Sequence, residues 1–149
     1  MKINNQFVIH AKKDDVWDFF MDAEKLAKCV PGCKEINMIS PTKYDSVIDV
    51  KIQFMTITFK TRGELLKAIE KERIIVEMNG KSIGLVGSFR NKLSVSLLES
   101  GKSETLVDYE MDMQMTGRLA SLGKVLMKGT ITKSSEEFAE NVQRLFQHS

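Results

Sequence analysis

The clearest signal in this chain is a change in the spacing of its apolar residues near Thr116–Leu119. Before this point, apolar and polar residues alternate over residues 105–116, which is typical of a strand with one buried face. The apolar set on that face is Val107, Tyr109, Met111, Met113 and Met115. Beyond it, spacings of three, four or their sums without a proline predict one long helix of about 45 Å through Leu119, Leu122, Leu126, Phe138, Val142 and Leu145.

The first third of the chain predicts a strand and two short helices. Residues 3–10 alternate and form the strand. Asp14 and Asp15 begin a helix, because acidic side chains stabilise its positive amino end. Asp22 is suited to cap a second short helix, which Pro31-Gly32 ends.

Residues 34–116 contain only strands and turns. The longest alternating run is 85–97, where glycines at 84 and 87 permit a sharp bend. Turns are predicted at 40–42, 53–55, 70–73, 79–81 and 100–102. This order predicts an α+β fold in which a curved, seven-stranded antiparallel sheet surrounds a long C-terminal helix, with two short helices after the first strand.

Composition limits the class of protein. The 149 residues, 42% apolar and 28% charged, are typical of a single globular domain spanning 1–149. A net charge of +2 is too small to indicate a nucleic-acid binder. The chain has no apolar run long enough to cross a bilayer and no signal core at its amino end, so a cytoplasmic location is expected.

No metal, cofactor or catalytic site is expected. Cys29 and Cys33 are interpreted as reduced, partly packed thiols, with a redox or metal role as the less favoured alternative. His10 and His148 stand at opposite ends of the chain and belong to no ligand-spaced cluster. Motifs of hydrolases, zinc proteases and phosphate-binding loops are absent from the sequence.

The three consecutive inward methionines allow two interpretations. They either fill the core or line a cavity, where flexible, polarisable side chains adapt to apolar ligands. Small residues in the middle of the predicted helix, such as Gly129 and Thr130, favour a cavity. Asn91 and Tyr109 lie in apolar inward series, where each either contacts a ligand head group or makes a core hydrogen bond.

Two further sets of residues each allow two interpretations. Trp17 and Phe20 either plug one end of the sheet or form the rim of a pocket. Lys124, Lys128 and Lys133 form a basic stripe that is either simply solvated or in contact with anionic lipid or an acidic partner.

Two blocks of sequence resemble a known family. One comprises Val16–Phe20 (VWDFF), Asp22–Ala27 (DAEKLA) and Val30–Lys34 (VPGCK). The other is Thr116–Gly123 (TGRLASLG), followed by Phe138 in the predicted helix. Together they resemble the CoxG family of carbon monoxide dehydrogenase subunits, within the SRPBCC superfamily of START-like, helix-grip proteins, over nearly the whole chain.

The resemblance implies a pocket for a hydrophobic ligand between the sheet and the long helix. It also implies association with molybdenum hydroxylases of the carbon monoxide dehydrogenase type, through maturation, membrane recruitment or quinone binding. The chain ends at Ser149 without the tail and hydrophobic anchor that some relatives carry. Membrane contact is therefore expected to be peripheral at most.

These observations predict a non-enzymatic protein that binds a lipid- or quinone-like molecule and serves a molybdenum hydroxylase system. The alternatives are an adaptor that recognises a partner by its surface, and an enzyme of the cyclase or aromatase type on the same fold. The predicted pocket residues are Phe59, Met78, Phe89, Asn91, Tyr109, Met111, Met113, Met115, Leu122 and Leu126, with Trp17 and Phe20 at the rim.

Overall fold

The computed structural model describes residues 1–84 and 86–147. Leu85, which was expected in a strand, and His148 lie outside the described residues. Along the described chain the elements are β1 (Lys2–Ile9), α1 (Lys13–Phe20), α2 (Ala23–Cys29), β2 (Cys33–Ser40), β3 (Lys43–Ile52), β4 (Met55–Ile69), β5 (Arg73–Ile83), β6 (Gly87–Gly101), β7 (Glu104–Thr116), α3 (Gly117–Ser121) and α4 (Lys124–Gln147).

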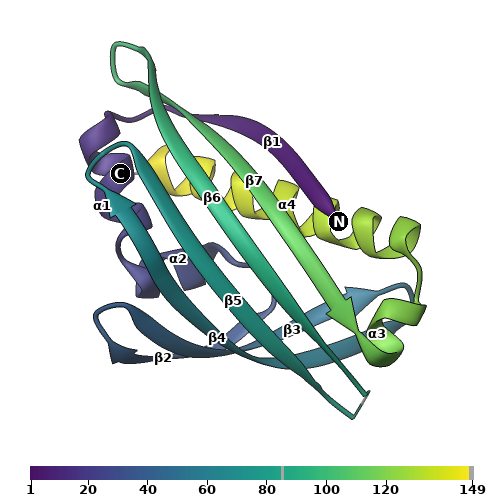
Figure 1. The fold of residues 1–149 in the computed structure, drawn as a ribbon. Coiled ribbons are helices and arrows are strands. Elements are labelled where there is room, and N and C mark those ends of the chain that lie inside the picture. The colour runs from purple at the N-terminus through teal and green to yellow at the C-terminus, as the bar shows by residue number, and fades with distance from the viewer. Residues whose placement is uncertain (85, 148–149) are drawn as a thin grey trace.

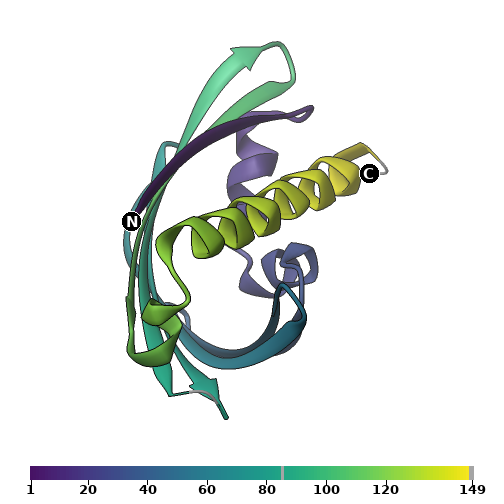
Figure 2. The same cartoon turned by 90° about the vertical axis from the view of Figure 1, so that its right-hand side faces the viewer.

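The strands form one antiparallel sheet in the order β1-β7-β6-β5-β4-β3-β2 (Figure 1). Consecutive strands from β2 to β7 are neighbours, and β1 pairs with β7 at the far edge. The sheet curves strongly, and α4 lies across its hollow side (Figure 2). The predicted fold class, a curved seven-stranded sheet with a long C-terminal helix, is confirmed.

The single long helix expected after β7 is interrupted. The short α3 ends at Ser121, and α4 begins at Lys124. Gly123 between them has φ +96°, a left-handed conformation that glycine adopts at little cost and that ends a helix. Within the described residues, no helix combines the length and hydropathy that a bilayer-spanning segment requires.

The turn predicted at Asn79–Lys81 is wrong, because these residues lie inside β5. Gly80 faces the hollow side directly opposite Phe89 of β6, and a Cβ at position 80 would collide with the Phe89 ring. Glycine is therefore used here for the close approach of an aromatic ring rather than for a turn. The chain reverses instead after Ile83.

The buried apolar residues form two clusters, one toward each end of α4. The larger cluster joins α1, the strands and the last turns of α4 through Ile9, Val16, Trp17, Phe19, Cys29, Ile74, Val95, Leu97, Val107, Tyr109 and Val142. The smaller cluster joins the β3–β4 hairpin to α3 and the first turns of α4 through Ile52, Ile57, Phe59, Leu119 and Met127.

The turn that follows α2 is fastened to β3. Gly32 has φ +78°, and its carbonyl oxygen accepts a hydrogen bond from the Asp49 N–H at 2.9 Å. The Asp49 carboxylate is 2.7 Å from Lys34 Nζ and accepts a hydrogen bond from Thr58 Oγ1 at 2.7 Å. Bonds from Lys34 and then Thr58 hold the pKa of this carboxyl below its usual value.

Replacing Gly32 by alanine is expected to destabilise the protein. A Cβ there would collide with the Asp49 carbonyl oxygen, and its φ is unfavourable for alanine. We expect a loss of about 2 kcal/mol in the free energy of unfolding, measured by urea titration.

Gly129→Ala is the matched control, because a Cβ at that helical position meets open space. It should be neutral or stabilising by up to about 1 kcal/mol. Equal midpoints for the two variants would contradict this account of the turn.

Candidate functional site

A cavity of about 340 Å³ lies between the hollow face of the sheet and α4. This volume is at the lower end of the range for small-molecule sites. Its sheet wall comprises Ile74, Val76, Met78, Phe89, Asn91, Leu93, Val95, Val107, Tyr109, Met111, Met113 and Met115, with Tyr44, Ser46, Ile48, Val50 and Phe59 from β3 and β4. Helix α4 adds Met127, Thr130, Ile131, Ser134, Ser135 and Phe138, and the α2 region adds Ala23, Leu26, Ala27, Val30 and Pro31.

Strand register brings the methionines beside their partners on β6. Across the β6–β7 pair, Met115 is opposite Phe89, Met113 is opposite Asn91, and Met111 is opposite Leu93. Alternation along each strand directs all of these side chains to the same face. Because methionine is unbranched and polarisable, this wall can adjust to apolar ligands of different shape.

Asn91 is the unusual polar group in this apolar wall. Its Oδ1 atom is buried and has no hydrogen-bond partner among the described residues. A buried acceptor without a partner costs about 1–3 kcal/mol, so such atoms are uncommon in native proteins. Asn91 Oδ1 therefore has free capacity to accept a hydrogen bond in the cavity wall.

Tyr44 belongs to the same row of the sheet as Asn91. The register runs from Tyr44 across Gly63 and Met78 to Asn91. The Tyr44 ring lies over Gly63, where a Cβ would collide with it. Burial, and secondarily the neighbouring Cys33, raises the pKa of the Tyr44 hydroxyl, which therefore stays protonated at neutral pH.

The other hydroxyl groups in the wall are largely satisfied by the protein. Ser46 and Thr61 hydrogen-bond to each other. On α4, Thr130 Oγ1 donates to the Leu126 carbonyl at 3.0 Å, and Ser135 Oγ donates to the Ile131 carbonyl at 2.8 Å. These helix hydroxyls face the cavity without demanding a ligand. They also take up less space than leucines would.

The cavity is electrically neutral. None of the described residues that line it is an Asp, Glu, His, Lys or Arg. Its titratable groups are Tyr44, Tyr109 and Cys33, and burial raises the pKa of the Cys33 thiol. His10 is exposed, 3.4 Å from Glu104, and does not line the cavity. The site therefore favours an uncharged ligand.

The structure brings eight of the ten predicted pocket residues together around this cavity: Phe59, Met78, Phe89, Asn91, Tyr109, Met111, Met113 and Met115. Leu122 and Leu126 are not part of its lining and pack against the smaller cluster instead. Because the helix is broken at Gly123, Leu122 and Leu126 do not lie on the single continuous helical face that the sequence predicted. Phe20 lines the cavity as expected, whereas Trp17 is buried in the larger cluster. A role in ligand binding stays a prediction for all of them.

Sequence reasoning missed the β3 side and the α2 side of the cavity. Tyr44, Ile48 and Val50 alternate along β3 and line the cavity, but alternation alone does not distinguish cavity residues from core residues. The one available signal was Gly63, which in a strand marks the close approach of another group. The contribution of α2 depends on how the helix is placed, which its short sequence does not reveal.

The comparisons with known proteins agree with this geometry. The family model of the carbon monoxide dehydrogenase subunit CoxG matches residues 6–146. No curated protein matches the chain significantly by sequence. A solved structure of a conserved protein from Geobacillus kaustophilus has a TM-score of 0.92 at 19% identity, covering 100% of this chain and 97% of that one.

Two further solved structures share the fold at lower similarity. A START superfamily protein from Mycobacterium smegmatis has a TM-score of 0.77 at 14% identity, covering 99% of this chain and 97% of that one. Zhui aromatase/cyclase from a Streptomyces species has a TM-score of 0.69 at 12% identity, covering 99% of this chain and 93% of that one. These likenesses establish a START-like fold, and the family model covers almost all of the sequence. The chain therefore belongs to the CoxG family of carbon monoxide dehydrogenase subunits.

Proposed function

We propose that this protein binds an uncharged, hydrophobic small molecule of lipid or quinone type in the cavity beneath α4. The observation that supports this most directly is the buried, unpartnered Oδ1 of Asn91 in an otherwise apolar wall. A ligand that buries on the order of 300 Å² of apolar surface would gain roughly 7 kcal/mol before the costs of association.

The ligand head group is expected to sit near the row that contains Tyr44 and Asn91. A hydroxyl on the ligand would donate to Asn91 Oδ1, and a carbonyl would accept from the Asn91 amide or the Tyr44 hydroxyl. A quinol hydroxyl can donate to Asn91 Oδ1, whereas a quinone carbonyl can only accept from the Asn91 amide or the Tyr44 hydroxyl. An ionised carboxylate would be disfavoured, because the described lining offers no cation to pair with it.

Binding without catalysis is part of the proposal. The described lining contains no carboxylate or imidazole to act as a general base, and burial keeps the Tyr44 and Cys33 protons in place at neutral pH. An aromatase/cyclase shares the fold. Shared fold does not by itself imply shared chemistry.

We further propose that the protein acts as an accessory factor of a carbon monoxide dehydrogenase or related molybdenum hydroxylase. This rests on membership of the family. The full chain, tagged and isolated from its native cells, should retain a molybdenum-containing partner, detected by elemental analysis of the eluate. Recovery of the protein free of molybdenum, from cells that make such an enzyme, would count against this part of the proposal.

Filling the cavity should abolish ligand binding. Ala27→Leu combined with Ser134→Leu adds volume from two helices, where leucine is well tolerated. Quenching of the single tryptophan, Trp17, by ubiquinone-1 measures affinity. We expect the double variant to bind at least about tenfold more weakly, a loss of about 1.4 kcal/mol. Ala120→Leu, at an exposed site on α3, is the control and should bind like the wild type. Unchanged affinity in a folded double variant would refute binding in this cavity.

Replacing Asn91 by leucine should raise the stability of the unliganded protein and lower its affinity for a quinone. The unliganded protein should gain about 1 kcal/mol of unfolding free energy, because an unsatisfied buried acceptor is removed. Affinity for ubiquinone-1 should fall about tenfold, a loss of about 1.4 kcal/mol, while affinity for a plain hydrocarbon stays the same. The control is Asn79→Leu on the exposed face of β5. If Asn91→Leu weakens quinone and hydrocarbon equally, the head group does not bind at Asn91.

A further inference from the structure

The position of Asn91 in the sheet makes its side-chain oxygen dependent on the contents of the cavity. On the hollow face, Met78 of β5 and Met113 of β7 lie directly opposite it in the register. Phe89 and Leu93 precede and follow it on the same face of β6. None of these four side chains has a hydrogen-bond donor. A proton for the buried, unpartnered Asn91 Oδ1 therefore has to come from the cavity side.

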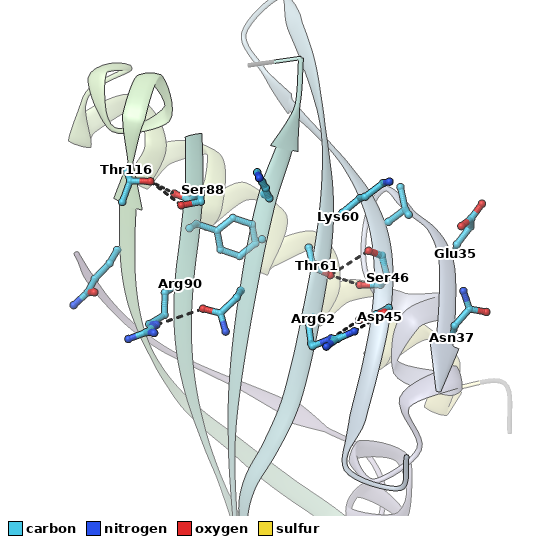
Figure 3. A pocket seen from close by; sticks show the side chains of 16 residues that line it. Glu35, Asn37, Asp45, Ser46, Lys60, Thr61, Arg62, Ser88, Arg90 and Thr116 are labelled. Atoms are coloured by element: carbon cyan, nitrogen blue, oxygen red, sulfur yellow. Dashed lines mark hydrogen bonds and ion pairs between the residues drawn. The ribbon is translucent and has the colours of Figure 1, made fainter. Parts of the chain in front are cut away.

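Other polar side chains of the neighbouring strands are already paired. On the outer face of β5, Asn79 Oδ1 accepts a hydrogen bond from Arg90 Nε at 3.4 Å. On the hollow face, Ser46 of β3 and Thr61 of β4 bond to each other through their hydroxyl groups, as Figure 3 shows. Among the described residues of the cavity wall, Asn91 thus supplies the buried acceptor for which the sheet provides no donor.

Tyr44 supplies a polar group of a different kind in the same row of the sheet. Its strand, β3, is three strand spacings from β6, which is about 14 Å between the strand axes. The Tyr44 ring lies over Gly63 of β4, which brings its hydroxyl closer to Asn91. A phenol both donates and accepts hydrogen bonds, so it can bond to a ligand carbonyl or to a ligand hydroxyl. Asn91 Oδ1 only accepts, and it therefore distinguishes between the two groups.

We propose that the cavity binds the reduced, quinol form of its ligand more tightly than the quinone form. This inference rests on the proposed function, because it assigns the preferred oxidation state of the same ligand. A quinol hydroxyl donates to Asn91 Oδ1, whereas a quinone has no proton to donate and leaves this acceptor without a partner. One hydrogen bond of this kind corresponds to a difference of about tenfold in affinity.

The lining also suits the second hydroxyl of a quinol. Each hydroxyl loses its hydrogen bonds to water on entering an apolar cavity, so each needs a partner inside. Asn91 Oδ1 accepts from one hydroxyl, and the Tyr44 oxygen can accept from the other. The described lining has no Lys, Arg or His that would stabilise an ionised quinol. The neutral quinol, with both of its protons, is therefore the form that the cavity favours.

Unequal affinity for the two forms shifts the reduction potential of the bound ligand. A quinone takes up two electrons and two protons to become the quinol, and the protein supplies neither. Because binding and reduction are linked, tenfold tighter binding of the quinol raises the potential of this two-electron couple by about 30 mV. The bound quinone is then easier to reduce than the free quinone. This preference suits a protein that accepts the product of a quinone-reducing enzyme.

Anaerobic equilibrium dialysis of the full chain against a mixture of ubiquinone-1 and ubiquinol-1 tests this preference. Chromatography of both compartments gives the affinity for each form, and the wild type should bind ubiquinol-1 about tenfold more tightly. Asn91→Leu should reduce this ratio to about one, because leucine has no acceptor. The dimethyl ether of ubiquinol-1 keeps the ring but has no hydroxyl to donate. It should bind the wild type no more tightly than ubiquinone-1 does.

Tyr44→Phe is the matched control within the cavity wall. A phenol bonds to either form of the ligand, so its loss should weaken both affinities and leave their ratio unchanged. Asn79→Leu, on the exposed face of β5, should keep both affinities and their ratio.

The outcomes separate this preference from the proposed function. Equal affinity of the wild type for both forms, tighter binding of ubiquinone-1, or a ratio that survives Asn91→Leu would overturn the preference and leave binding in the cavity intact. Binding of neither form would overturn the proposed function and this inference with it.

Discussion

The structure depends on how α4 is held against a curved sheet. Packing is dense at its two ends, where Met127 belongs to one buried cluster and Val142 to the other. Near the second end, Asn141 Nδ2 donates to the Cys29 carbonyl at 3.0 Å, and Gln143 Nε2 donates to the Val8 carbonyl at 2.9 Å. The middle of the helix presents small hydroxyl side chains to the sheet. A helix fixed at both ends cannot move inward to close the remaining space, and the cavity persists for this reason.

The chemistry of that space follows from its isolation from charge. An apolar wall with only neutral hydroxyl, thiol and amide groups excludes ionised ligands and gains affinity from buried area. Asn91 carries a cost in the free protein, since its side-chain carbonyl lacks a partner. Natural proteins tolerate such a cost where a polar group serves binding, and the stability lost there is supplied by packing elsewhere.

The smaller buried cluster supports one end of the cavity. Phe59, Leu119 and Met127 of this cluster also form part of the cavity wall. The helix break at Gly123 belongs to the same arrangement, because it lets α3 lie against β6 and β7 while α4 crosses the sheet at a different angle. A continuous helix would present Val125 and Lys124 in another direction.

The sequence by itself determined the order of the strands and the part of the cavity wall that β6 and the end of β7 supply. Alternation with a period of two assigns Asn91, Tyr109 and the three methionines to one face without knowledge of their neighbours. It also determined the cap at Asp22, whose side chain accepts from the Lys25 N–H at 3.1 Å. Tertiary structure decided the rest. Gly80 locally resembles a turn residue and instead makes room for Phe89, and Gly123 divides a periodic helix. Whether inward apolar residues fill a volume or surround it depends on the distance between sheet and helix, a property of packing that local periodicity does not encode.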